Sequence, residues 1–257
     1  MKRFFAVLLA LRLAGCSAPA SVSGPAASAT VPVEEARTCR IADGAESGSL
    51  MLSEQREGGS LYRMSAADVP VTLDGEDASA ADLRDGMLVT VYFTGGIQES
   101  YPGGFYQVNR LEAVREGADD RVGLALEALE DLWSEDTALN EGIEQLSVYI
   151  DEALVPNAAE RAAAAWRFAE LHRLPPPMDY SWQELCWAGY VDEETLSWEK
   201  GCYLELRAAQ DAGAGEDLCF DAQKWRGGLA AILYAGCTAR QSGDGAWEYR
   251  RGDFAIA

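Results

Sequence analysis

The most unusual group of chemically capable residues is a short basic segment in an otherwise acidic chain. Lys224 and Arg226 flank Trp225, and two glycines, Gly227 and Gly228, follow directly. Two cations beside an aromatic ring can bind an anionic group, and glycines let a backbone approach closely. The alternative interpretation is the end or bulge of a strand whose cations pair with nearby acidic side chains. We prefer this alternative and retain Lys224, Trp225 and Arg226 as the candidate anion-binding residues.

Acid–base and metal chemistry have few candidates outside the carboxylates. His172 is the only histidine, and its place at the end of a predicted helix suits a cation that caps the helix. A Ser–His or Cys–His catalytic pair would have to use it, and a histidine-based metal site would need more. Paired carboxylates for glycoside hydrolysis are defined by their distance in space, so 42 acidic residues neither identify nor exclude them. We therefore assign no catalytic residue, no metal ligand and no cofactor.

Six cysteines raise the question of disulfides. Cys16 lies near the N-terminus, and the other five are an odd number, so at least one is unpaired or pairs with another molecule. If the strands around Cys219 and Cys237 form a hairpin, these two residues lie nearly opposite one another and could be bridged. If the preceding strand pairs with the same strand, Cys202 competes for Cys219. The remaining interpretation is that these cysteines are small buried hydrophobic residues.

The N-terminus has the pattern of an export signal. Lys2 and Arg3 form a positive start, an apolar stretch covers residues 4–11, and small residues precede Cys16. The L-A-G-C tetrapeptide that ends at Cys16 resembles the lipobox of bacterial lipoproteins, although Arg12 interrupts the sequence just before it. This resemblance implies a lipid on Cys16 that anchors the chain to a membrane, because two or more acyl chains bind a membrane stably. The alternative is an ordinary cleaved signal with a chance cysteine.

Composition excludes several classes of function. The chain has 257 residues, of which 48% are hydrophobic and 25% charged, as in ordinary globular proteins. Acidic residues outnumber basic ones by 42 to 21, which gives a formal net charge of −21. A nucleic-acid-binding protein needs a basic surface for the phosphates, so we expect no nucleic-acid partner. After the N-terminus no apolar run reaches the ~18 residues of a membrane span.

Four segments follow from these patterns. We expect a lipoprotein signal peptide over residues 1–15 and a flexible tether, rich in Ala, Ser and Pro, over residues 16–36. Residues 37–117 contain short strand candidates between glycine-rich or polar breaks, which predicts a small β-barrel-like, OB-like domain. Residues 118–257 predict an α+β domain in which helices come first, an antiparallel meander follows, and the helices pack on the sheet.

Periodicity places the elements of the second domain. Apolar residues at helical spacing and capping residues predict helices over residues 119–133, 139–154, 158–171 and 181–189. Alternating apolar residues predict strands over residues 196–207, 217–226, 229–240 and 247–250. All seven tryptophans fall in this domain, which marks it as the larger core.

Several motifs resemble uncharacterised lipoproteins of Gram-positive bacteria. In the small β domain they are D-L-x-x-G-M-x-V-x-V at residues 82–91 and I-Q-E-S-Y-P at 97–102. In the second domain they are F-D-A-Q-K-W-R-G-G at 220–228 and G-C-T-A at 236–239. The resemblance implies the fold and a location at the extracytoplasmic face of the cell membrane, held by lipidated Cys16.

These observations lead to an expectation about function. We expect a non-catalytic binding or interaction module at the cell envelope, with an envelope protein or a small ligand as partner. The alternative is an envelope hydrolase that uses paired carboxylates. A cleft with two carboxylates of raised pKa would favour the enzyme, whereas a broad exposed apolar patch without such a pair would favour the interaction module.

Overall fold

The computed structural model describes residues 33–209 and 217–256. Pro32–Ala257 forms one compact unit. The predicted signal peptide, Cys16 and most of the predicted tether lie outside the described residues. The first strand already begins at Glu35, inside the segment 16–36 that we expected to be a tether. Glu35 and Ala36 pair with strand β6, so these two residues belong to the sheet and not to the predicted tether.

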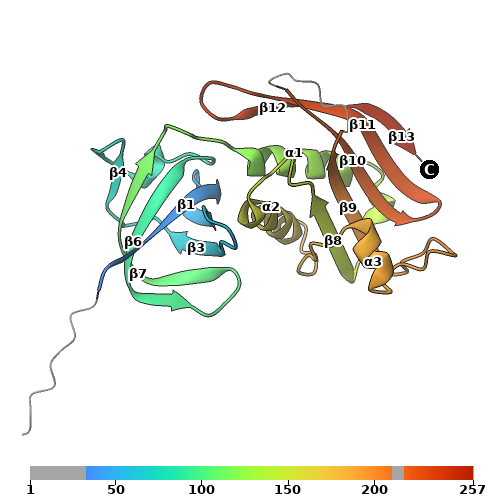
Figure 1. The fold of residues 1–257 in the computed structure, drawn as a ribbon, viewed down its shortest axis with the longest axis horizontal. Coiled ribbons are helices and arrows are strands. Elements are labelled where there is room, and N and C mark those ends of the chain that lie inside the picture. The colour runs from blue at the N-terminus through green and yellow to red at the C-terminus, as the bar shows by residue number, and fades with distance from the viewer. Residues whose placement is uncertain (1–32, 210–216, 257) are drawn as a thin grey trace, which may run out of the picture. The chain divides into compact units, whose positions relative to one another are not determined.

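The N-terminal part is a closed five-stranded β-barrel, as the sequence predicts (Figure 1). Five strands close around it in the order β3-β2-β1-β6-β7, and a parallel pairing of β3 with β7 completes the circle. A short hairpin, β4 and β5, extends the sheet from β7, and the 3-10 turn η1 follows it. The bounds are β1 (Glu35–Asp43), β2 (Ser49–Glu54), β3 (Leu61–Ser65), β4 (Val71–Leu73), β5 (Glu76–Ala78), η1 (Ala80–Asp82), β6 (Leu88–Gln98) and β7 (Gly103–Val114).

Alternation of side chains builds the barrel core. Successive residues of a strand point to opposite faces, so Val89, Val91 and Phe93 of β6 all point inward and are buried. Closure also needs a glycine: a Cβ at Gly103 would lie 3.0 Å from the ring of Tyr62 on the paired strand β3. The absence of a side chain therefore lets β3 and β7 approach each other.

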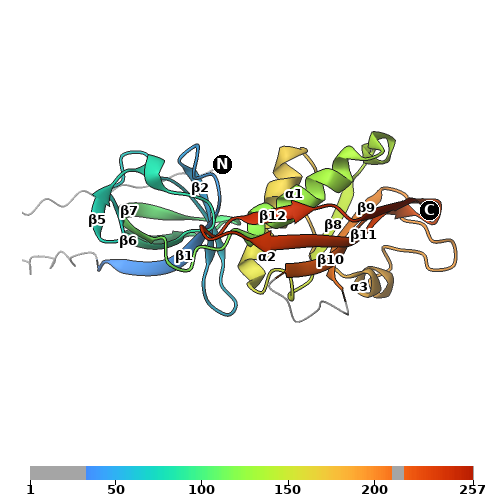
Figure 2. The ribbon, with the colours of Figure 1, turned by 90° about the horizontal axis from the view of Figure 1, so that it is seen from above.

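The C-terminal part combines helices with a second sheet (Figures 1 and 2). The sheet has the strand order β12-β11-β10-β9-β8, and β13 pairs with β11 beside β12. The bounds are α1 (Arg121–Ser134), η2 (Thr137–Asn140), β8 (Gln145–Ile150), α2 (Ala158–Leu171), α3 (Trp182–Trp187), β9 (Gly201–Ala208), β10 (Asp217–Gly227), β11 (Ala230–Gln241), β12 (Trp247–Arg250) and β13 (Asp253–Ile256). No helix in the described ranges is both long enough and apolar enough to cross a membrane.

Capping residues fix the helices near their predicted limits. Asp120 caps α1 by accepting a hydrogen bond from the N–H of Gly123, and Asn157 caps α2 through the N–H groups of Ala159 and Glu160. Ser181 begins α3 with a capping box that it forms with Glu184. These helices therefore confirm the predictions for 119–133, 158–171 and 181–189 to within a few residues.

The predicted helix over 139–154 is wrong. This segment contains the 3-10 turn η2 and then strand β8. Leu146 and Ile150 are four residues apart, which fits a helix, but Val148 between them is buried on the same face and gives the period of two of a strand. β8 runs parallel to β9, so the prediction of an entirely antiparallel sheet is also wrong at this edge. The antiparallel meander holds from β9 to β12.

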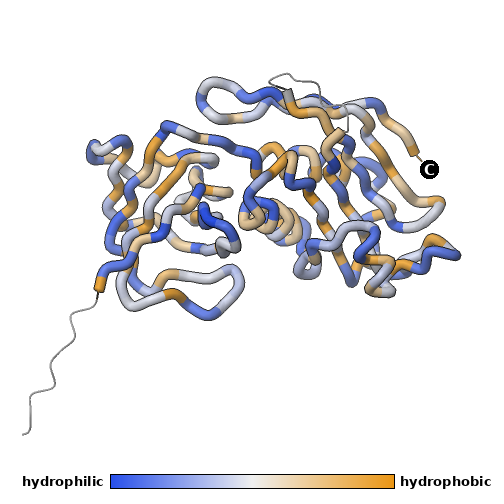
Figure 3. The backbone as a smooth tube through the Cα atoms, in the orientation of Figure 1, coloured by the Kyte–Doolittle hydropathy of each residue, from blue (hydrophilic) through white to orange (hydrophobic). Residues whose placement is uncertain are grey.

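The second sheet contributes buried residues to a different hydrophobic cluster on each of its faces. Hydrophobic and hydrophilic residues both occur along its strands (Figure 3). On one face, alternate residues of β8 to β11, such as Val148 and Leu204, share a buried cluster with α1 and α2 side chains, such as Leu129 and Phe168. The opposite face carries a separate buried cluster of Leu185, Val191, Trp198, Tyr203 and Trp225. Leu185 belongs to α3, so this helix packs against the second face of the sheet.

Candidate functional site

The basic segment that we retained as a candidate anion site is used inside the chain. Lys224 is completely buried, and its ammonium group donates hydrogen bonds to the carbonyls of Glu135 and Asp136 and, at 3.1 Å, to Oδ1 of Asn140. These carbonyls lie where α1 ends, so the cation stabilises the negative end of the helix. Burial lowers the pKa of Lys224. The partners are backbone carbonyls and an amide, not the acidic side chains that we expected.

Arg226 extends the same contact, whereas Trp225 is separated from it. The Arg226 guanidinium donates to the carbonyl oxygens of Leu139, at 2.7 Å, and Glu141, at 3.1 Å. Trp225 lies on the other face of the sheet, because side chains alternate along β10. Its ring packs edge-on against Trp182, with ring centroids 4.5 Å apart. The three candidate residues therefore do not converge on one anion site.

The proposed bridge between Cys219 and Cys237 is not formed. In the pairing of β10 with β11, Cys219 lies opposite Thr238, and Cys237 lies opposite Phe220. Neighbouring rungs of a sheet place side chains on opposite faces, so the two sulfur atoms point apart. Each of the five cysteines in the described part of the chain is a free thiol. Burial raises the pKa of Cys202 to about 12, as expected for a small hydrophobic core residue.

The histidine has the structural position that the sequence suggested. His172 is the C-cap residue of α2, and its Nε2 lies 2.7 Å from Oε1 of Glu130 on α1. Its ring also packs against Trp133 and Phe168. His172 therefore links the two helices.

The candidate site is a pocket of about 620 Å³ formed by three segments far apart in the sequence. The first precedes β6, the second joins β7 to α1, and the third is the turn between β11 and β12. Its lining residues are Arg84, Asp85, Met87, Arg115, Ala118, Asp120, Gly243, Asp244 and Ala246. The volume lies in the range of small-molecule sites.

Backbone hydrogen bonds hold these three segments together. The N–H of Asp119 donates to the carbonyl of Gly86 at 3.0 Å, and the N–H of Asp120 donates to the carbonyl of Gly245 at 2.9 Å. Both glycines have positive φ angles, +84° and +91°. A Cβ at Gly86 would lie 2.8 Å from the nitrogen of Asp120, and one at Gly245 would lie 2.4 Å from the carbonyl oxygen of Ala118. The walls of the pocket therefore depend on two glycines.

Two carboxyl groups in this pocket have raised pKa values. Burial raises the pKa of Asp120 to about 6, and the neighbouring carboxylate of Asp85 adds to the effect. Burial also raises the pKa of Asp85, and the negative charge of Asp43 raises it further. Each group keeps one backbone partner: Asp120 accepts from Gly123, at 2.9 Å, and Asp85 accepts from the N–H of Ala45, at 3.0 Å. Asp120 can therefore act as a hydrogen-bond donor or acceptor close to neutral pH.

The cations around the pocket already have partners within the chain. Arg84 donates to the carbonyls of Ala81 and Leu83, and Arg115 pairs with Asp74. The remaining lining charge is Asp244, a carboxylate whose pKa is lowered by the Ser242 hydroxyl group. The charge that faces a ligand in the pocket is therefore mainly negative.

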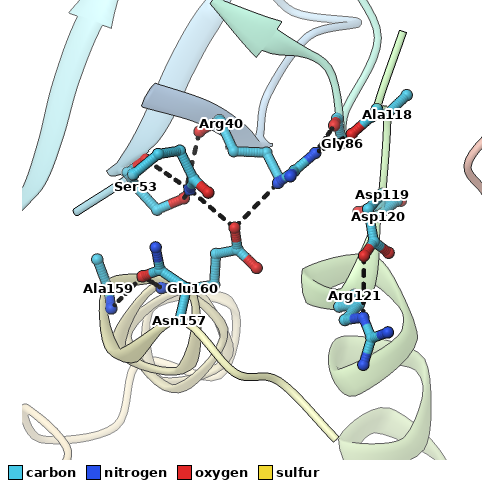
Figure 4. Close-up of polar contacts among 12 residues, drawn as sticks. Arg40, Ser53, Gly86, Ala118, Asp119, Asp120, Arg121, Asn157, Ala159 and Glu160 are labelled. Atoms are coloured by element: carbon cyan, nitrogen blue, oxygen red, sulfur yellow. Dashed lines mark hydrogen bonds and ion pairs between the residues drawn. The ribbon is translucent and has the colours of Figure 1, made fainter. Parts of the chain in front are cut away.

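An ion pair between Arg40 and the buried carboxylate of Glu160 lies next to the pocket (Figure 4). Arg40 on β1 donates to Oε1 of Glu160 on α2 at 3.0 Å and to the carbonyl oxygens of Gly86 and Gly117 at 2.7 and 2.8 Å. Gln55 donates to the same oxygen of Glu160 at 2.8 Å. Arg40 thus holds the segment before β6 and the segment after β7 in place, and both segments line the pocket.

The sequence identified parts of this site without showing that they meet. A helix is predicted over residues 119–133, and glycines at positions 86, 243 and 245 are visible in the sequence as candidate turn residues. Their meeting depends on tertiary packing, for which the local sequence gives no signal. Within the described residues there is no group of three or more histidine, cysteine or acidic side chains arranged to hold a metal ion. Comparison with known proteins found no matching family model, no matching curated protein and no matching solved structure.

Proposed function

We propose that this chain is an exported, lipid-anchored protein of the extracytoplasmic face of the cell membrane, and that its folded body is a non-catalytic binding module. The L-A-G-C tetrapeptide supports the anchor, with Cys16 as the lipidated residue. The resemblance to uncharacterised lipoproteins of Gram-positive bacteria supports the location. Within this proposal the barrel is an OB-like domain, and α1 and α2 pack on the second sheet.

The observation that carries the binding proposal is the pocket of about 620 Å³ around Asp85 and Asp120. It combines carboxyl groups with small apolar surface from Met87, Ala118 and Ala246. A few placed polar groups in a partly apolar cavity are typical of small-molecule sites.

The charge of the pocket points to a ligand that carries an amine. An ammonium group placed between Asp85 and Asp120 would donate hydrogen bonds to both carboxylates and would favour their charged forms. An anionic ligand would meet Asp85, Asp120 and Asp244, while Arg84 and Arg115 are held by other groups. We therefore propose a small amine as the ligand class.

A thermal-melting experiment tests this proposal. The purified chain is melted with spermidine, lysine amide and benzylamine, and separately with succinate and sorbitol. An amine present at about 100 times its dissociation constant adds roughly 2.7 kcal/mol to the free energy of unfolding, which raises the melting temperature. We expect a rise with at least one amine and none with succinate.

Matched variants separate pocket binding from general charge effects. Asp120→Asn should abolish the amine-induced rise, because asparagine retains the helix cap but not the charge. Asp77→Asn, an exposed aspartate on β5 outside the pocket lining, should retain it. Equal rises in both variants would contradict binding in this pocket.

One observation favours a second candidate function, an envelope hydrolase. Asp85 and Asp120 line one pocket, and the Asp120 pKa of about 6 suits a general acid. Glycoside hydrolysis by this pair predicts turnover of aryl glycosides that is lost in Asp85→Asn and in Asp120→Asn. If the natural chain turns over an aryl glycoside and both variants do not, the hydrolase proposal would replace the binding proposal.

A further inference from the structure

A second groove lies on the face of the sheet that α1 and α2 do not cover. It has a volume of about 430 Å³ and sits at the β8–β9 edge, beside the start of α3. Its lining residues are Tyr149, Asp151, Ser181, Trp182, Gln183, Glu205, Arg207 and Ala208. None of these residues lines the Asp120 pocket.

Two aromatic side chains form part of the groove wall. The Trp182 ring is held by an edge-on contact with Trp225, at 4.5 Å between centroids, and by Tyr203, at 5.9 Å. Its backbone N–H also donates to the Tyr203 hydroxyl group at 3.1 Å. Tyr149 is half-buried, and its hydroxyl group has no hydrogen-bond partner among the described residues. One wall is thus fixed in place, and the other carries a free polar group.

The polar side chains of the groove include both negative and positive charges, and both hydrogen-bond acceptors and donors. Glu205 is 4% exposed, and its Oε1 accepts hydrogen bonds from Arg207 at 2.6 and 3.0 Å. Asp151 is fixed by the N–H groups of Ala153, at 2.9 Å, and Ala208, at 3.3 Å. The carboxylates accept hydrogen bonds, whereas the guanidinium group of Arg207 donates them.

We propose that this groove binds a neutral polyhydroxylated ring, that is, a saccharide. The faces of Tyr149 and Trp182 offer apolar surface to the C–H groups of a sugar ring. Asp151 and Glu205 accept hydrogen bonds from hydroxyl groups, and Arg207 donates to them. The charges of Glu205 and Arg207 are paired with each other, and Asp151 is held by two backbone N–H groups, so a neutral ligand that carries both donors and acceptors matches these polar groups best. This site is independent of the amine pocket.

Ligand-observed NMR and titration calorimetry test the proposal on the full chain. The probes are cellobiose and N,N′-diacetylchitobiose as neutral saccharides, lysine amide as a cation and glucuronate as an anion. At least one disaccharide is expected to bind with a dissociation constant of about 1 mM or tighter, with saturation transfer to its ring C–H protons. Binding of lysine amide or glucuronate that is lost in Tyr149→Ala, without disaccharide binding, would overturn the ligand class.

Variants assign the binding to the groove. Tyr149→Ala is expected to weaken disaccharide binding at least tenfold, and Gln183→Ala severalfold. Tyr106→Ala, which changes an exposed tyrosine on β7, is the matched control and should bind as tightly as the natural chain. Gln183 is exposed, so its variant tests the groove even if Tyr149→Ala loses its fold, which near-ultraviolet circular dichroism would detect. Failure of both disaccharides to bind, or equal binding by all three variants, would overturn the proposal.

Discussion

The close approach of the barrel to the start of α1 makes Gly86 a sharp test of how the pocket is built. Gly86 has a φ of +84°, and a Cβ there would lie 2.8 Å from the nitrogen and 2.9 Å from the Cβ of Asp120. Gly86→Ala therefore adds two costs to the folded state. The left-handed backbone conformation costs an alanine about 1–2 kcal/mol. Displacing the start of α1 costs roughly 1–3 kcal/mol more, as overpacking of an interior usually does.

Gly48 provides the matched control. Its φ is +70°, and a Cβ there would meet no heavy atom within 4 Å. Gly48→Ala therefore carries the backbone cost alone, about 1–2 kcal/mol. The difference between the two variants isolates the steric contact, and we expect Gly86→Ala to be less stable by about 2 kcal/mol.

Urea unfolding followed by tryptophan fluorescence measures both free energies of unfolding. The midpoint should fall further in Gly86→Ala than in Gly48→Ala, with similar slopes. Equal midpoints would refute the contact between Gly86 and Asp120, and with it the proposed construction of the pocket.

Three further predictions concern charge and thiols. Burial raises the Asp120 pKa to about 6. As the pH rises from 4 to 7, the free energy of unfolding of the natural chain should therefore fall by at most about 3 kcal/mol relative to that of Asp120→Asn, as urea unfolding would measure. Lys224→Met should destabilise by about 2–4 kcal/mol, because buried carbonyls lose their donor, whereas Lys200→Met, at an exposed ion pair, should cost under about 1 kcal/mol. Alkylation of the urea-unfolded chain without reductant should modify both Cys219 and Cys237, and a mass for a bridged pair would contradict the register.

The sign of the pH prediction follows from where the proton binds. Between the unfolded pKa of about 3.9 and the folded pKa of about 6, the folded chain holds a proton on Asp120 that the unfolded chain has lost. The stabilisation is therefore fully present below pH 4 and is lost as the pH rises through 6. An opposite trend would show that Asp120 is stabilised in its charged form.

Local signals predicted much of the fold. Alternation in β6 and the glycine-separated strand candidates predicted the barrel, and Asn157 and Ser181 predicted two helix starts. These features depend on side chains within a few positions of one another, so sequence patterns contain them.

The errors arose where one pattern fits two periods or where contacts are long-range. Leu146 and Ile150 fit a helix and a strand equally, and pairing with β9 decides in favour of the strand. Lys224 alternates with Trp225 on a strand, so residues adjacent in sequence face different layers. The meeting of Gly86, Asp120 and Gly245 depends on packing between segments more than 30 residues apart.

Titration calorimetry of an amine against pH tests the central claim most directly. The amine that raises the melting temperature is titrated into the full chain at pH 5, 6, 7 and 8, alongside Asp120→Asn. We predict that affinity rises as the pH increases through about 6, because Asp120 becomes charged, and that the variant binds weakly at every pH. Affinity independent of pH, or equal affinity in the variant, would contradict the proposal that this pocket binds amines through Asp120.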